Sequence, residues 1–192
     1  MALVLTSGPA AEPITLAEAK AHMRVDGTAE DTLVSSLIIT SRLHIEAALG
    51  LAFITQAWSY FLDAWPASRE VRLPLRPVQS ITAVRLYAAD ESIETVPADT
   101  YMLDGAANPA RLVRNDTAAW PKPSRAANGI EIAFVAGYGN LAASVPAPIR
   151  QAILLLVAHW YEHREPVELG APGVPVPPMV SELLLPYRSV RL

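Results

Sequence analysis

The chain has 192 residues, no cysteine, and 15 basic against 19 acidic side chains, which gives a formal net charge of -4. This length is enough for one domain with a substantial hydrophobic core. The absence of cysteine excludes a disulfide framework, a thiolate zinc site and a cysteine nucleophile. The acidic balance and the scattered basic residues disfavour tight, nonspecific binding to DNA phosphates.

The chain begins with a short apolar run, Met1-Ala2-Leu3-Val4-Leu5, that lacks the basic region and the long apolar core of a secretory signal. We therefore expect an unprocessed chain in which residues 1–12 form a flexible arm. The longest apolar stretch, from Ala152 to Tyr161, is about half as long as a membrane-spanning helix and contains His159. We expect no association with a membrane.

Two helix-start signals follow. Thr15-Leu16-Ala17-Glu18 is a capping box, in which each side chain accepts a hydrogen bond from the other residue's backbone amide, so a helix is predicted over residues 15–25. Thr28-Ala29-Glu30-Asp31 repeats the signal, and apolar residues then recur at three- and four-residue spacing. A second, longer helix is predicted over residues 29–50, with Gly50 at its end.

The period changes after residue 53, where short runs of β-branched and aromatic residues alternate with turn signals such as Asp104-Gly105 and Asn128-Gly129. These runs predict strands over residues 53–62, 71–75, 81–88, 101–103, 112–113 and 130–135. We therefore predict a mostly antiparallel β insertion over residues 53–136.

A third helix is predicted over residues 146–165, because Pro146 and Pro148 fit a first helical turn and Pro166 ends the pattern. Further prolines predict an extended tail over residues 166–192. The predicted fold class is α+β: a helical bundle of two N-terminal helices and one long C-terminal helix, with a β insertion. Residues 13–165 are expected to form one domain.

Residues 159–163, His-Trp-Tyr-Glu-His, fit the H-x-x-E-H pattern of inverted zincins. In that pattern two histidines on one helix bind zinc and the glutamate activates water. A metallopeptidase that uses His159, Glu162 and His163 is therefore one alternative. No helix is predicted downstream to present a third ligand, so the simpler interpretation is a helix end whose histidines face the negative end of the helix dipole.

Residues 137–142, Gly-Tyr-Gly-Asn-Leu-Ala, fit the G-x-G-x-x-A turn of dinucleotide-binding proteins. Such a turn leads directly into a helix, whereas Pro146 and Pro148 delay the helix here, so a structural turn is predicted. Among the tryptophans, Trp58 and Trp160 are predicted to lie in the core. Trp65 and Trp120 fit a core position and an interface equally well.

Taken in order, several short motifs resemble the head-tail connector, or adaptor, proteins of long-tailed phages and of phage-like gene transfer agents. They are residues 14–20 with Arg24-Val25-Asp26, Glu30-Asp31, Leu73-Pro74 with Pro77-Val78, residues 136–139, Val145-Pro146 with residues 149–152, residues 160–164 and residues 184–188. The resemblance runs from about residue 13 to the end of the chain.

This resemblance implies a structural, non-enzymatic connector domain over residues 13–165, with no cofactor and no metal. Such subunits form a homo-oligomeric ring, usually of about twelve copies. The ring contacts the portal protein and a stopper or tail-terminator protein, and DNA passes through its channel without sequence-specific binding. The expected location is the neck of a virion or phage-like particle, after synthesis in the cytoplasm of a bacterial host. Another neck or tail-completion protein is the remaining alternative.

The tail is the expected partner-binding segment, and we expect residues 180–188 to dock on the portal protein. The residues assigned to this contact are Val180, Leu183, Leu184, Leu185, Tyr187 and Arg188. The leucines and the tyrosine would be apolar anchors, and the arginine would satisfy a polar rim.

Overall fold

The computed structural model describes residues 1–115, 119–163 and 176–188. The chain divides into two compact units. The β unit comprises residues 1–10 and 50–140, and the helical unit comprises residues 11–49 and those from 141 onward. The domain expected from the sequence over residues 13–165 includes most of both units.

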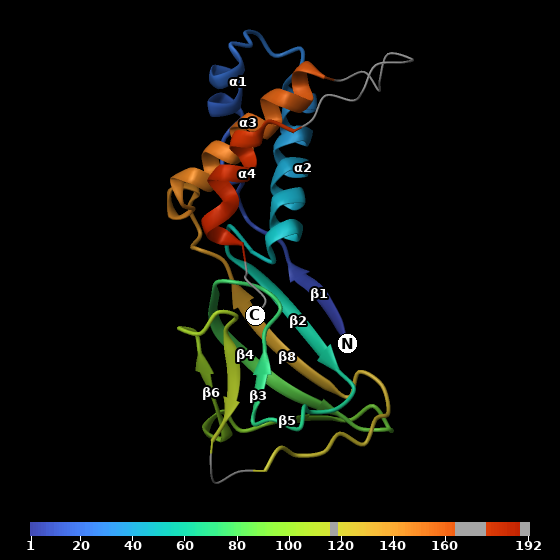
Figure 1. Cartoon of the computed structure of the whole chain (residues 1–192). Helices are drawn as coiled ribbons and strands as arrows, with labels where there is room; N and C mark the ends of the chain where they lie inside the picture. The colour runs from blue at the N-terminus through green and yellow to red at the C-terminus, as the bar shows by residue number, and fades with distance from the viewer. Residues whose placement is uncertain (116–118, 164–175, 189–192) are drawn as a thin grey trace, which may run out of the picture. The chain divides into compact units, whose positions relative to one another are not determined.

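The helical unit contains α1 (Leu16–Met23), α2 (Asp31–Leu49), α3 (Ala147–Glu162) and α4 (Pro178–Leu184), with short 3-10 turns at Ala142–Ser144 and Leu185–Tyr187 (Figure 1). The predicted capping box is present, because the Glu18 amide donates to Thr15 Oγ1 (3.1 Å) and the Thr15 amide donates to Glu18 Oε2 (2.7 Å). Helices α1, α2 and α3 correspond to the three predicted helices, and each is slightly shorter than predicted.

The core of the helical unit is built from apolar side chains that recur on the facing sides of its helices. Its buried members include Ile14, Ala19, Val34, Ile38, Ile45, Leu49, Ile149, Ile153, Leu156, Val157, Val180 and Leu184. Within the described residues, no helix is long and apolar enough to cross a membrane.

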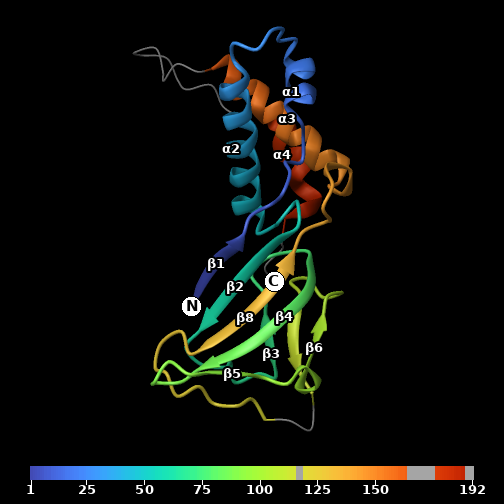
Figure 2. The same ribbon diagram turned by 180° about the vertical axis from the view of Figure 1, so that it is seen from behind.

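The β unit contains two sheets whose paired strands are antiparallel, as predicted. The five-stranded sheet has the order β1 (Ala2–Ser7), β2 (Gln56–Leu62), β8 (Ile130–Ala136), β4 (Val78–Tyr87) and β5 (Ile93–Thr95). Strands β2, β8 and β4 lie side by side in Figure 2. The three-stranded sheet has the order β3 (Glu70–Arg72), β7 (Arg111–Arg114) and β6 (Tyr101–Asp104), and a short 3-10 turn, Ala98–Thr100, precedes β6.

Both sheets contribute to one apolar core. Ile130, Ile132 and Phe134 alternate along β8 toward this core, where they join Val71 of β3 and Leu112 of β7. Alternate residues of a strand point to opposite faces, so the period of two in β8 decides which face is buried.

The N-terminal segment differs from its prediction as a flexible arm over residues 1–12. Residues Ala2–Ser7 form β1, which pairs with β2 from Ala2 opposite Phe61 to Ser7 opposite Ala57. The pairing satisfies the backbone groups on one side of the strand, and Leu3 packs against the core of the β unit. These contacts join residues at least fifty positions apart.

The C-terminal tail also differs from its prediction as an extended segment over residues 166–192. Pro178–Leu184 forms α4, with Pro178 in the first turn, where a proline lacks only an amide that has no helical partner. Val180 and Leu184, four residues apart on one helix face, are buried. Residues 164–175 and 189–192, which include the predicted end of the third helix, lie outside the described residues.

Candidate partner-binding site

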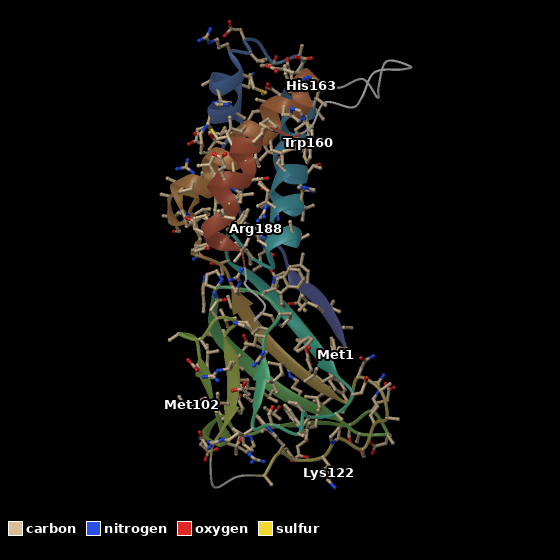
Figure 3. All side chains as sticks on the ribbon, in the orientation of Figure 1. Met1, Met102, Lys122, Trp160, His163 and Arg188 are labelled. Carbon is tan, nitrogen blue, oxygen red and sulfur yellow. The ribbon has the colours of Figure 1, made fainter. Side chains whose placement is uncertain are left out.

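The six residues predicted to bind a partner lie on α4 and the turn after it, but they point in different directions. Val180 and Leu184 are 5% and 8% exposed and belong to the core of the helical unit. Leu183 and Tyr187 are half-buried, whereas Leu185 is 62% exposed. Arg188, which is labelled in Figure 3, is exposed. The structure therefore brings four of the six to an accessible position.

A groove of about 460 Å³ separates the end of α4 from the neighbouring helices. Its apolar walls come from α2 and α3 on one side and from α4 on the other. The residues that line it include Ile45, Ala48, Leu49, Leu156, Val180, Leu184 and Arg188. Sequence reasoning missed this groove, although the four-residue spacing of Val180 and Leu184 is the signal of a helix that uses one face to pack.

The accessible part of α4 and its adjoining turn combines apolar side chains with two exposed charged residues, Glu182 on the helix and Arg188 at the rim of the groove. Met179 is 57% exposed and lies beside the half-buried Leu183, and Leu185 and Arg188 follow in the adjoining turn. An exposed apolar group with a charged residue at its border is the composition of a protein-binding patch rather than of a catalytic centre.

The H-x-x-E-H residues at the end of α3 do not form a metal centre. His159 is 9% exposed, Nδ1 of His163 lies 2.8 Å from the carbonyl oxygen of His159, and Glu162 faces solvent. In the described parts of the chain, no three histidine, aspartate or glutamate side chains are grouped so that they would hold a metal ion. The metallopeptidase alternative receives no support from this arrangement.

The glycines of the G-x-G-x-x-A motif serve a close approach between backbone segments. The Gly137 amide donates to the Pro77 carbonyl (2.9 Å), and the Gly139 carbonyl accepts from the Thr55 amide (3.0 Å). A Cβ atom added at Gly137 would lie 2.7 Å from the backbone of Ile54. The motif is thus a structural turn after β8, as the position of the following prolines indicated.

The two tryptophans that the sequence left undecided pack against the core of the β unit. The rings of Trp65 and Trp120 stack with their centroids 4.0 Å apart and their planes 9° apart, and Trp65 Nε1 donates to the Pro121 carbonyl (2.7 Å). Trp58 is partly buried against the same core. The ring of Trp160 makes an edge-to-face contact with the ring of His44, with the two ring centroids 5.7 Å apart.

A buried carboxylate, Glu131 on β8, is held by three donors. Ser59 Oγ donates to Oε1 (2.6 Å), while Tyr87 Oη and Arg85 Nη1 donate to Oε2 (2.8 and 3.1 Å). Burial favours the neutral acid, but these hydrogen bonds and the charge of Arg85 outweigh it and hold the pKa of Glu131 below its ordinary value. An ionised, fully bonded carboxylate is a structural group rather than a proton donor.

Comparison with solved structures supports the same interpretation. The chain is similar to chains in the neck of an empty gene transfer agent (GTA) particle computed with C6 symmetry, in the virion of a native GTA particle, and in the neck of a native GTA particle computed with C12 symmetry. The TM-scores are 0.83, 0.83 and 0.81. In each case the identity is 28%, and the match covers 100% of this chain and 97% of the other.

Among curated proteins, none matches the chain. A sequence profile does match, and its description is "Head completion protein". The match extends over residues 12–190, which is nearly the whole chain and includes most of both compact units. This chain therefore belongs to the head completion protein family.

Proposed function

We propose that this chain is a structural head-tail connector, a subunit that repeats around the axis of a particle neck and joins the head to the tail. The observation that carries the proposal is the whole-chain similarity to subunits of GTA necks, together with the head completion family match. It places the protein in the neck of a phage-like particle.

The subunits form a ring of twelve copies. The support is that one of the similar necks was computed with C12 symmetry and another with C6 symmetry, a subgroup of the former. A closed ring needs heterologous contacts, in which one face of a subunit fits a different face of the next. The subunit would act by shape and contact, without a cofactor or a chemical step.

The ring joins the portal protein on its head side to a stopper or tail-terminator protein on its tail side, and DNA passes through its channel without sequence-specific contacts. The formal net charge of -4 supports a passive channel, because a strongly basic wall would retain DNA through its phosphates. A non-enzymatic role agrees with the bonded state of Glu131 and with the arrangement of His159 and His163.

The portal-binding surface consists of the accessible residues Leu183, Leu185, Tyr187 and Arg188. Val180 and Leu184 have a supporting role, because they hold α4 against the helical unit and so fix the direction of its outer side. Leu185 is 62% exposed, so burial of its remaining exposed surface is worth about 1–2 kcal/mol, a change of about five- to thirtyfold in affinity.

The test is native mass spectrometry of the purified chain mixed with its cognate portal. The expected product is one portal that carries twelve copies, and chain that remains unbound at micromolar concentration would contradict the proposal. Leu185→Asp is expected to weaken portal binding at least tenfold. Met102→Asp is the matched control, because Met102 on β6 is also more than half exposed but lies outside the proposed surface.

A second measurement places the function in the particle. Particles produced without this chain are expected to be heads that lack tails, visible by electron microscopy, while free tails accumulate beside them. Normally tailed particles in the absence of the chain would show that it has no connecting role.

A further inference from the structure

The longest helix, α2, has an outer surface without a charged residue. Its 19 residues include three charged ones, and each of them is engaged elsewhere. Asp31 accepts a hydrogen bond from Lys20 (2.5 Å), and Arg42 and Glu46 are buried and bonded to each other (2.8 Å). A helix that borders water on its outer side normally carries charged residues there.

The uncharged residues form a continuous stripe, which we call the α2 stripe. Its members are Thr32, Ser36, Ile39, Thr40, Leu43 and Ala47, all of them exposed. At 3.6 residues per turn they fall within an arc of about 100°, and the stripe is about 22 Å long. Ile39 and Leu43, one turn apart at its centre, are 42% and 51% exposed.

The stripe lies away from the packed side of α2. Over the C-terminal half of α2, both α3 and α4 are found on the same side of the helix (Figures 1 and 2). The groove residues Ile45, Ala48 and Leu49 mark that packed side. The α2 stripe is therefore distinct from the surface that we assign to portal binding.

Removing the stripe from water costs little free energy of desolvation. Thr40 Oγ1 already donates to the Ser36 carbonyl within the helix (2.8 Å), so its hydroxyl need not lose a bond to solvent. No ion must be desolvated, and Ser36, Thr40 and Ala47 are small enough to let another backbone approach. These properties are typical of the apolar centre of a permanent interface rather than of a transient contact.

We propose that the α2 stripe is the centre of the contact with the neighbouring copy of this chain in the ring. The inference rests on the proposed function, because a ring obliges every subunit to bury two faces permanently against its neighbours. The GTA necks that the chain resembles were computed with sixfold and twelvefold symmetry, which requires such repeated contacts.

The size of the stripe agrees with a central position in a larger interface. A strip about 22 Å long and about 10 Å wide covers about 220 Å², whereas a stable interface buries about 800 Å² per partner. Ile39 and Leu43 would be the anchors of this contact, and flanking surfaces would supply the rest. A central apolar cluster inside a larger contact carries most of the binding energy.

The first test is photocrosslinking inside assembled particles. A benzophenone amino acid is incorporated at position 43, and the purified particles are irradiated and analysed on denaturing gels with mass spectrometry. The expected product is a dimer of this chain, at twice its mass of 20.7 kDa. Crosslinks from position 43 to a different polypeptide, or no crosslink at all, would overturn the inference. A probe at the exposed Leu141, outside the stripe, is expected to give little or no dimer.

The second test is substitution. Leu43→Asp is expected to fold normally, because the side chain is exposed, but to reduce incorporation into particles at least tenfold. Leu141→Asp, at a position that is 69% exposed, should be incorporated like the natural chain. Normal incorporation of Leu43→Asp would contradict the inference and leave the connector function intact. Absence of the natural chain from the particle neck would overturn the function itself and the ring contact with it.

Discussion

Arg42 on α2 binds Glu12 through two hydrogen bonds, from Nε to Oε2 (2.7 Å) and from Nη2 to Oε1 (3.2 Å). The same guanidinium donates from Nη1 to Glu46 Oε2 (2.8 Å), one helical turn further along α2. The arginine is only 6% exposed. It therefore joins the segment that precedes α1 to the middle of α2 and neutralises part of the charge of two carboxylates.

The first prediction concerns this cluster. Arg42→Ala should lower the free energy of unfolding by about 3 kcal/mol, because it removes a buried guanidinium that binds both Glu46 and Glu12. Urea unfolding followed by circular dichroism measures the change. The control is Arg72→Ala, which removes a largely exposed arginine whose Nε lies 3.6 Å from Glu70 Oε1. This substitution should lower the free energy of unfolding by less than about 1 kcal/mol. Equal losses in both variants would contradict the assigned importance of the buried cluster.

The second prediction concerns Glu131 and pH. Its pKa is lower in the folded chain than its ordinary value of 4.5, so the ionised carboxylate stabilises the fold at neutral pH. That stabilisation is present above about pH 4.5 and is lost as the pH falls through the lower pKa of the folded state. Glu131→Gln should therefore reduce stability by about 1–3 kcal/mol at pH 7 and make the remaining stability less sensitive to acid.

Denaturant unfolding at several pH values between 3 and 7 gives the comparison for Glu131. Glu94→Gln on β5 is the control, since Glu94 is exposed and its substitution should leave the stability nearly unchanged. A Glu131→Gln variant that keeps the full acid sensitivity of the natural chain would refute the role of this carboxylate.

Local signals in the sequence were sufficient for the elements whose ends are set by nearby residues. The capping box at Thr15 and Glu18 fixes the start of α1, and the three- and four-residue period from Leu33 to Leu49 fixes the extent of α2. The β-branched run from residue 130 to 135 likewise predicted β8. In each case the structure follows from contacts within a few residues.

The elements that were missed depend on distant partners. Residues 2–7 become a strand only because they pair with the edge of β2, which lies at least fifty positions away in the sequence. Prolines at both ends of residues 178–184, among them Pro177 and Pro186, suggested an extended tail, yet α4 forms and buries Val180 and Leu184 in the helical unit. The residues expected to bind a partner form one segment of the chain, but their division into buried and accessible side chains was not predictable.

The third prediction concerns the turn after β8. Gly137 has a φ of +137° and no room for a Cβ atom, which would lie 2.7 Å from the backbone of Ile54. Gly137→Ala should therefore destabilise the chain by about 2 kcal/mol or more, from backbone strain and from the displaced neighbour. Thermal unfolding measures the effect.

Gly27→Ala provides a matched control for this position. Gly27 also has a positive φ, +76°, but nothing lies within 4 Å of an added Cβ atom. The cost there should be confined to backbone strain of about 1 kcal/mol. If both variants lost the same stability, the close approach of Gly137 to Ile54 would have no energetic importance.

The last prediction separates the two sides of the C-terminal segment. Leu184 is 8% exposed and lines the groove. Leu184→Ala should reduce the free energy of unfolding by about 2 kcal/mol, because the substitution removes buried apolar surface. This cost is at the lower end of the range for a buried leucine, because the groove is open. Leu185 is 62% exposed, so Leu185→Ala should change stability by less than about 0.5 kcal/mol.

The affinity for the portal should change in the opposite order, with the larger loss for Leu185→Ala and the smaller for Leu184→Ala. Leu185→Ala removes a side chain that we expect to enter the portal contact, so its affinity should fall while its unfolding curve matches that of the natural chain. Leu184→Ala, measured at a temperature where it is still folded, should bind nearly as well as the natural chain because its outer side is unchanged. Denaturant unfolding and titration calorimetry on the same two samples give both quantities. A Leu185→Ala variant with normal affinity, or a Leu184→Ala variant with normal stability, would show that the inner and outer sides of this segment are assigned incorrectly.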